Sequence, residues 1–202
     1  MNIFDLFEFY FLILFYVVFI GRSIMLKLTG TNPFALGKEK KGLNSFIEIL
    51  FIPVLLFWSW EVLRQSMNID ILILPGFIYE KLHLSIFVGL SGIVLTLAGF
   101  VLFIAALVSF GDSWRIGIDK EKPADLVTKG VFRFSRNPVF LFIDLYFFGT
   151  FLVYSSLFFG LSFVIVALLL QYQIVQEETY LKKIYGEKYT KYMEKTPRYF
   201  GF

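Results

Sequence analysis

Residues 138–176 decide the fold, because they read PVFLFIDLYFFGTFLVYSSLFFGLSFVIVALLLQYQIVQ and carry one charged side chain, Asp144. As one straight helix, these 39 residues would extend about 58 Å, nearly twice the roughly 30 Å thickness of a hydrocarbon core. The segment must therefore fold back on itself. Its most polar central point, Tyr154-Ser155-Ser156, is where we predict the turn. The sequence thus predicts a helical hairpin that crosses the membrane twice.

Three further apolar blocks precede this hairpin, and each is long enough to cross a membrane. They are about Leu6–Met25, Leu43–Leu63, which contains Glu48 and Pro53, and Leu84–Phe110, which carries no charge. The composition agrees, because only 17% of the residues are charged, against about 25% in soluble domains. We therefore predict an all-α integral membrane protein with five transmembrane helices, the last two forming the hairpin.

Lysine and arginine residues gather on one side of this topology. All 19 of them except Arg64 and Lys81 lie in the loop after the first span, the loop after the third span or the C-terminal tail. Since such loops stay in the cytoplasm, we expect the N-terminus outside and the C-terminus in the cytoplasm. We expect one membrane domain over residues 1–202, with three spans in residues 1–110 and the functional region in residues 111–202.

The composition also excludes several kinds of site. The chain has no cysteine and a single histidine, so thiolate sites and multi-histidine metal sites are excluded, and we expect no metal. A net charge of only +3 argues against a nucleic-acid partner. Gly89, Gly92, Thr96 and Gly99 share one face of the third predicted span, and such small residues favour close packing of helices within a bundle.

Two predicted cytoplasmic stretches, Gly111–Asn137 and Glu177–Phe202, flank the hairpin and therefore return to the same membrane face. In the first, Asn137 is a favoured N-cap and Pro138 a favoured first helical residue. The pair either simply begins the fourth span or, together with Arg136, forms a helix N-terminus that attracts a carboxylate or phosphate.

Carboxylates mark the second stretch and the hairpin itself. Glu177 and Glu178 either form a solvated helix turn at the membrane boundary, or one of them faces inward and meets a cationic ligand. Asp144 lies about two turns into the fourth span, where an ionisable group normally needs a partner. The candidates are Gln171, Gln173 or a tyrosine hydroxyl.

Tyrosines follow the carboxylates at helical spacing. Tyr185, Tyr189 and Tyr192 lie on one face of a helical pattern that is interrupted at Gly186. Together with the neighbouring lysines, this pattern predicts an amphipathic helix that lies on the membrane surface.

In their order and spacing, these motifs resemble the isoprenylcysteine carboxyl methyltransferase family and its bacterial and archaeal relatives, which are also similar to the phospholipid methyltransferases. The family pattern is a Gly-aromatic entry, Arg-His-Pro-x-Tyr, a helical hairpin, Glu-Glu, Phe-Gly-x-x-Tyr-x-x-Tyr and a terminal Pro-Arg. The resemblance covers roughly Gly111 to Arg198 and includes Ser113–Ile118, which is similar to bacterial members. The matching residues are Gly130-Val131-Phe132, Arg136-Asn137-Pro138-Val139-Phe140, Glu177-Glu178, Tyr185-Gly186-Glu187-Lys188-Tyr189-Thr190-Lys191-Tyr192 and Pro197-Arg198.

The resemblance implies that S-adenosylmethionine binds in a pocket built by the cytoplasmic loop and the C-terminal helix, in a prokaryotic plasma membrane. It implies methyl transfer to a lipophilic small-molecule or lipid acceptor, whose carboxyl, amine or hydroxyl chemistry stays open. Counting nine residues back from Gly186 gives Glu177, the position of the family's cofactor-binding glutamate. The candidate catalytic residues are Glu177, Gln173 and Arg136. The candidate cofactor-binding residues are Leu126 and Val127 in the loop segment Ala124–Val127, together with Phe132, Asn137, Pro138, Val139, Phe140, Glu177, Glu178 and Tyr189.

Three positions depart from the family's usual residues. Asn137 replaces a histidine and Phe140 replaces a tyrosine. Gln173 stands where the prenylcysteine enzymes have a substrate-binding arginine, four residues before Glu177. A guanidinium pairs with a carboxylate in a bidentate manner, so Gln173 argues against a prenylcysteine carboxylate as the substrate.

The proposed chemistry fits this inventory of residues. A sulfonium donor is already activated, so positioning and exclusion of water supply most of the acceleration without a metal or a thiol. An amine or hydroxyl acceptor would need a proton acceptor, for which Glu177, Glu178 and Asp144 are the candidates.

Two other classes of protein compete with this interpretation. The first is an NADPH-dependent membrane reductase of sterol-reductase-like architecture, but such tails usually carry an Arg-Asp-Glu cluster and a longer aromatic ending. The second is a non-enzymatic scaffold or small transporter. Transporters often show inverted repeats, and no internal repeat is evident here.

Overall fold

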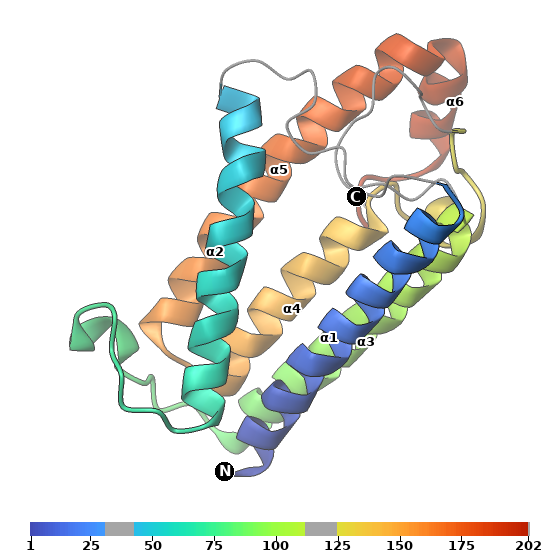
Figure 1. Ribbon diagram of the computed structural model, residues 1–202. Helices are drawn as coiled ribbons and strands as arrows, with labels where there is room; N and C mark the ends of the chain where they lie inside the picture. Colours follow the sequence, from blue (N-terminus) through green and yellow to red (C-terminus); the bar gives the residue numbers. More distant parts are fainter. Residues whose placement is uncertain (31–42, 112–124, 202) are drawn as a thin grey trace. The chain divides into compact units, whose positions relative to one another are not determined.

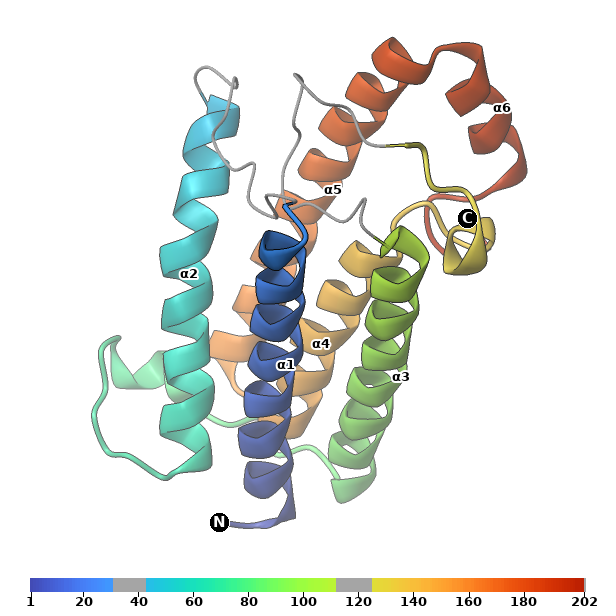
Figure 2. The ribbon, with the colours of Figure 1, turned by 45° about the vertical axis from the view of Figure 1, so that its right-hand side comes forward.

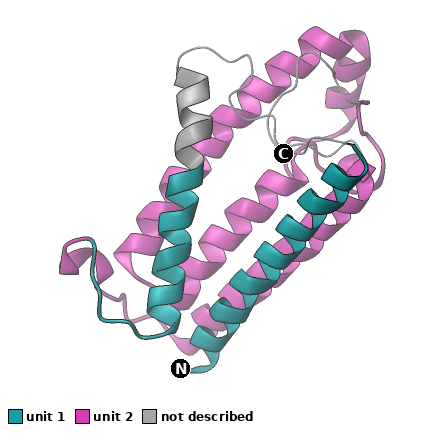
Figure 3. Ribbon diagram, viewed as in Figure 1, with its two compact units in different colours: residues 1–73, 112–124 teal, residues 74–111, 125–202 magenta. Residues whose placement is uncertain are grey.

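The computed structural model describes residues 1–30, 43–111 and 125–201, and for residues 43–51 only the helical backbone. The predictions for Ser113–Ile118, for Ala124 and for the side chain of Glu48 lie outside these ranges. Every regular element in the described ranges is a helix (Figure 1), apart from an isolated bridge between Lys81 and Ser156. The chain divides into two compact units, which Figure 3 colours separately and which are described one at a time.

The first unit contains α1 (Ile3–Leu28) and α2 (Leu43–Ser66). A capping box begins α1, because Asn2 and Asp5 each accept a hydrogen bond from the other's backbone N–H at 2.9 Å. A hydrogen bond of 2.7 Å between the hydroxyls of Tyr16 in α1 and Ser59 in α2 joins the two helices. The first two predicted spans are therefore confirmed as helices.

The second unit contains the predicted hairpin. The predicted turn is confirmed, since one helix ends at Tyr154, the next begins at Leu157, and Ser155 takes the left-handed conformation that ends a helix. The elements of this unit are η1 (Gly76–Tyr79), α3 (Ile86–Phe110), η3 (Gly130–Arg133), α4 (Pro138–Tyr154), α5 (Leu157–Tyr185) and α6 (Glu187–Lys195).

One boundary of the hairpin differs from its prediction. The second arm was predicted to end near Gln176, but α5 continues to Tyr185 and is 29 residues long. At about 1.5 Å per residue this helix extends about 43 Å, so its last turns exceed the thickness of a hydrocarbon core. Hydropathy marks where a helix leaves the apolar layer and does not mark where its backbone stops being helical. In Figures 1 and 2, α6 then turns back from the end of α5 toward the start of α4.

Small residues bring α3 and α4 together, as the sequence predicted. A Cβ atom built on Gly92 would lie 2.6 Å from the carbonyl oxygen of Gly149, and one built on Gly149 would collide with the Thr96 hydroxyl. Toward the C-terminal end of α3, the rings of Phe103 and Phe142 stack with their centroids 4.8 Å apart. Aromatic packing therefore holds α4 near its start, and close backbone contact holds it near its end.

The lengths of the helices agree with an integral membrane protein. Within the part of the chain that the structure describes, α1, α3 and α5 are each long and apolar enough to cross a membrane. The helix α4 is also apolar but has only 17 residues, near the lower limit for a span. The complete topology of five spans stays a prediction.

Candidate functional site

The candidate site begins where α4 begins. Asn137 occupies the N-cap position and Pro138 follows within the first turn, as predicted. The Asn137 side chain accepts no capping hydrogen bond, however, and its amide nitrogen donates one of 3.2 Å to the carbonyl oxygen of Arg198. The hydroxyl of Ser135 donates to the same carbonyl at 3.1 Å. Two side chains beside the helix start are thus turned toward the C-terminal segment.

That segment, Thr196–Tyr199, is called the C-terminal strap below. It runs beside the residues that precede α4, since the backbone N–H of Arg136 donates to the carbonyl of Pro197 at 3.0 Å. The Arg136 guanidinium donates to the carbonyl oxygen of Thr196 at 2.7 Å. The strap and the start of α4 therefore form one small assembly, although about sixty positions separate them in the sequence.

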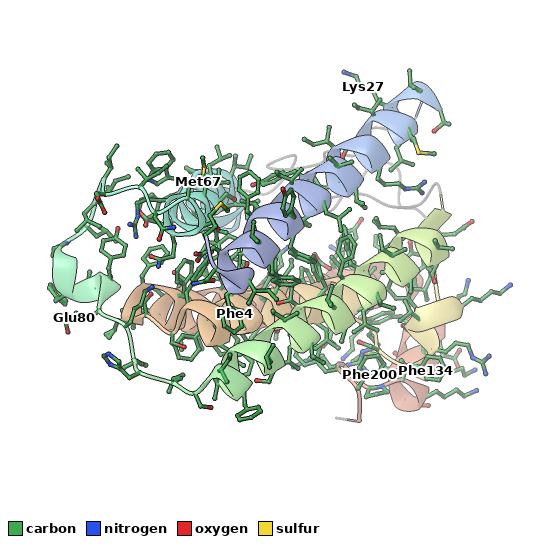
Figure 4. All side chains as sticks on the ribbon, turned by 90° about the horizontal axis from the view of Figure 1, so that it is seen from below. Phe4, Lys27, Met67, Glu80, Phe134 and Phe200 are labelled. Atoms are coloured by element: carbon green, nitrogen blue, oxygen red, sulfur yellow. The ribbon has the colours of Figure 1, made fainter. Side chains whose placement is uncertain are left out.

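The exposed neighbours of these two segments lie at the same end of the unit. Figure 4 labels Phe134, which precedes the Ser135–Asn137 segment, and Phe200, which follows the strap, at the end opposite Glu80. Both rings are exposed.

A buried carboxylate joins the strap and the start of α4 to α5. Oε1 of Glu178 accepts a hydrogen bond of 2.7 Å from Nη2 of Arg136, and Oε2 accepts one of 2.6 Å from Nη2 of Arg198. Arg198 also donates from Nε to Oε1 at 3.1 Å, so it binds the carboxylate in a bidentate manner. These hydrogen bonds raise the pKa of Arg198 above its ordinary value. Arg136, Glu178 and Arg198 are called the Glu178 cluster below.

The second glutamate of the pair has different surroundings. Glu177 is half-buried, and its Oε1 accepts a hydrogen bond of 3.1 Å from the amide nitrogen of Gln173, one turn earlier on α5. Two of the three candidate catalytic residues are thus in contact. The third, Arg136, belongs instead to the Glu178 cluster, and so does Glu178, which the sequence made a candidate cofactor ligand.

Tyr189 and Phe132 place α6 and η3 in the same region. The predicted interruption at Gly186 is confirmed, because this residue takes a φ of +52° between α5 and α6. Tyr189 is buried, and burial, followed by the negative charge of Glu178, raises its pKa to about 12. The hydroxyl of Tyr192 donates to the carbonyl of Phe132 at 2.6 Å, so α6 is tied to the loop that precedes α4.

Asp144 finds its partner on the strap. Its Oδ2 accepts a hydrogen bond of 2.9 Å from the hydroxyl of Tyr199, and that hydroxyl accepts one of 3.1 Å from the amide of Gln171. The prediction of a tyrosine hydroxyl as partner is confirmed, with Gln171 as the next member of the chain. Burial and the nearby carboxylate raise the pKa of Tyr199, which keeps the hydroxyl protonated as a donor.

The remaining candidate cofactor-binding residues are apolar, and their side chains make no polar contact with the Glu178 cluster. Leu126 and Val127 are half-buried in the segment before η3, and Val139 and Phe140 are half-buried in the first turn of α4. Apolar side chains such as these can form only the walls of a site.

Sequence reasoning left one functional distinction open and missed a set of partners. It did not decide which glutamate faces inward, although Val166, Leu170, Ile174 and Glu178 form one buried row at spacings of four. It did not predict Ser135 as a partner, it noted Arg198 only as part of a motif, and it expected a tyrosine hydroxyl beside Asp144 without identifying Tyr199.

Comparison with known proteins identifies the family. A model of the phospholipid methyltransferase family matches residues 84–188, from just before α3 into the start of α6. No curated protein matches the chain. The match contains the start of α4, the hairpin and both glutamates, but it ends before the strap. Because it covers just over half of the sequence, the protein belongs to the phospholipid methyltransferase family.

Proposed function

We propose that this protein transfers a methyl group from S-adenosylmethionine to a lipophilic acceptor in the membrane. The observation that carries the proposal is the family match over residues 84–188, which implies a membrane methyltransferase that acts on lipid. Family membership argues against the reductase and against the non-enzymatic scaffold. The hydrogen bond between Arg136 and Glu178 supports a site drawn from both flanks of the hairpin, because their neighbours Asn137 and Glu177 are the candidate ligands.

The residues near the start of α4 fit the groups that such a donor carries. S-adenosylmethionine supplies an activated methyl group on a sulfonium, and it also carries an ammonium and a carboxylate. Among the described residues, no side chain caps the first turn of α4, so its N–H groups suit the carboxylate. Glu177 suits the ammonium, and the aromatic face of Tyr189 suits the sulfonium.

The apolar candidates complete this assignment. Leu126 and Val127 precede η3, and Val139 and Phe140 belong to the first turn of α4. In the proposed site they exclude water from the cofactor, and exclusion of water strengthens the electrostatic interactions inside a site.

The contact of Gln173 bears on the chemical class of the acceptor. Its amide donates to Glu177 and thereby orients that carboxylate. This contact gives Gln173 a role that does not require a carboxylate substrate. An arginine would recognise a carboxylate substrate better than a glutamine does. A carboxyl, amine or hydroxyl acceptor stays compatible with the family.

We further propose five spans with the N-terminus outside and the C-terminus in the cytoplasm. The chain has no cysteine, so a single introduced cysteine reports its own location. In intact cells, a membrane-impermeant maleimide should label Lys81→Cys and should not label Lys191→Cys until the membrane is permeabilised. The opposite pattern would overturn the proposed orientation.

Binding of S-adenosylhomocysteine to the purified protein in detergent tests the cofactor. A ligand at about 100 times its Kd stabilises the folded state by about 2.7 kcal/mol, which a thermal unfolding curve resolves. We expect stabilisation by S-adenosylhomocysteine and none by NADPH. Glu177→Gln should weaken the affinity at least about tenfold, because a hydrogen-bonded charge contributes roughly 1.5–3 kcal/mol.

The matched control for this variant is Glu187→Gln, because Glu187 is an exposed glutamate whose side chain pairs only with Lys191 among the described ion pairs. It should leave the affinity unchanged. Equal affinities in wild type and Glu177→Gln would remove Glu177 from the site, and stabilisation by NADPH alone would overturn the proposed function.

A further inference from the structure

We infer that Glu178 is a positioning residue and not a cofactor ligand: through Arg136 and Arg198 it holds the C-terminal strap against the start of α4. The inference rests on the proposed function, because the part of the molecule that Glu178 organises is the part assigned to S-adenosylmethionine. It changes the role that the sequence suggested for two residues, since Glu178 was a candidate cofactor ligand and Arg136 a candidate catalytic residue.

The carboxylate of Glu178 is already engaged on both oxygens. Oε1 accepts from Arg136 and Arg198, and Oε2 accepts from Arg198. The side chain is only 9% exposed, as is that of Arg136. An ammonium that approached Glu178 would therefore have to displace a guanidinium from a short, charge-assisted hydrogen bond.

The charge of the cluster gives a second argument. Two guanidinium groups surround one carboxylate, so the cluster carries a net positive charge. A net positive charge does not attract the ammonium of the proposed cofactor, and it favours an anion. Glu178 therefore does not provide the negative charge that attracts the donor, and Glu177 is the remaining carboxylate of the pair.

The contacts of the two arginines show what Glu178 positions. The Arg136 guanidinium also donates to the carbonyls of Met193 and Thr196, at 3.1 Å and 2.7 Å, and its backbone N–H donates to Pro197. The carbonyl of Arg198, which belongs to the strap, accepts hydrogen bonds from the side chains of Ser135 and Asn137. Glu178 thus joins three segments: α5, the strap and the residues that begin α4.

This arrangement affects the helix start directly. Asn137 gives its side-chain amide to the strap, which leaves the first turn of α4 without a side-chain cap among the described residues. The strap thereby keeps the N–H groups of this turn available for the carboxylate of the cofactor. Loss of the strap would let Asn137 turn back and cap its own helix, which is its usual behaviour.

The experiment compares Glu178→Gln, Arg198→Gln and the double variant, with Glu187→Gln as the control. The first measurement is hydrogen–deuterium exchange over residues 189–199 in the ligand-free protein. We expect faster exchange in Glu178→Gln and in Arg198→Gln, and no change in Glu187→Gln. Because this measurement needs no cofactor, it tests the positioning role even if the wild type binds no S-adenosylhomocysteine, a result that would count only against the proposed function.

The second measurement is the affinity for S-adenosylhomocysteine. We expect Glu178→Gln to raise the Kd by about 10- to 100-fold, the range expected when a supporting contact misplaces a site. The double variant should resemble Glu178→Gln alone, because both changes remove the same contact. Arg198→Lys, which keeps the charge but loses the bidentate geometry, should restore part of the affinity that Arg198→Gln loses.

The third measurement separates a positioning role from a catalytic one. With a membrane lipid extract as the acceptor, Glu178→Gln should keep a kcat within a few-fold of the wild type at saturating S-adenosylmethionine, while its KM for the donor rises. A large fall in kcat would overturn the inference. So would weakened affinity with unchanged exchange of residues 189–199, since this combination means that Glu178 contacts the cofactor directly. If Glu178→Gln does not fold, Arg198→Gln carries the same three measurements, because its partly exposed side chain is more easily lost.

Discussion

Two joints in the second unit solve the same problem, holding α4 in place, by opposite means. The joint between α3 and α4 depends on missing side chains, because Gly92 and Gly149 let the two backbones approach until an added Cβ atom would collide. The joint between α4 and the strap depends on long polar side chains, with Glu178 buried between Arg136 and Arg198. One joint lies between apolar helices, and the other lies among polar residues at the helix ends.

The difference follows from the surroundings of each joint. Lipid tails are as apolar as the side chains of a span, so close packing, and not the hydrophobic effect, drives helices together in a membrane. Where the helices end, water competes for every polar group. A buried carboxylate with two guanidinium partners then specifies one geometry, because leaving any member of the cluster unpaired is costly.

The largest effect should come from removing the carboxylate of the polar joint. Glu178→Ala leaves the buried guanidinium of Arg136 without its anionic partner, which typically costs about 3–5 kcal/mol. For a protein of this size, such a loss lowers the midpoint of thermal unfolding by about 6–20 °C. Circular dichroism of the detergent-solubilised protein measures the midpoint. A shift below about 2 °C would show that the cluster adds little to stability.

Disrupting the joint between α3 and α4 should cost less stability. Gly149→Ala places a methyl group against the Thr96 hydroxyl and the Gly92 carbonyl, and overpacking of this kind costs about 1–3 kcal/mol. Gly21→Ala in α1 is the matched control, because a Cβ atom there meets nothing within 4 Å. Alanine favours a helix over glycine by roughly 1 kcal/mol, so the control should be neutral or stabilising. Equal behaviour of the two variants would contradict the close approach of α3 and α4.

The two joints also differ in how far the sequence predicts them. The glycine row of α3 and the turn at Tyr154-Ser155-Ser156 were predictable, because helical spacing and the length of an apolar run are local properties. The extension of α5 to Tyr185 was not predictable from hydropathy. It has a physical reason, since a helix can continue into water without changing its hydrogen bonding.

The polar joint was predictable only in part. The position of Asn137 at a helix start was correct, but the use of its side chain was not, because the partner is a carbonyl of Arg198 far along the chain. The pairing of Glu178 with Arg198 depends on how α6 folds back, which no local pattern encodes. The row of buried residues that leads to Glu178 could have shown which glutamate faces inward.

The hydroxyl of Tyr199 should matter less than the carboxylate of Glu178. Tyr199→Phe removes the 2.9 Å hydrogen bond to Asp144 and leaves that side chain without its partner, at a cost of about 1–3 kcal/mol. Tyr10→Phe is the control, because Tyr10 is an exposed tyrosine of α1. Loss of its hydroxyl should change the midpoint of thermal unfolding by less than about 1 °C. If Tyr199→Phe behaves like this control, the Tyr199 hydroxyl adds little to holding the end of the strap.

The smallest effect should come from an ion pair that resembles the Glu178 cluster in charge but not in burial. Lys191 and Glu187 lie 2.9 Å apart on α6 with side chains 66% and 81% exposed, and exposed pairs of this kind contribute about 0.3–0.5 kcal/mol. Glu187→Gln should therefore move the unfolding midpoint by no more than about 2 °C. In 1 M salt, where the screening length falls to about 3 Å, even this difference should vanish. The effect of Glu178→Ala should persist, because the buried partner Arg136 is shielded from ions. If salt removed both effects equally, charge alone would hold the strap, and burial would not distinguish the polar joint from an ordinary surface pair.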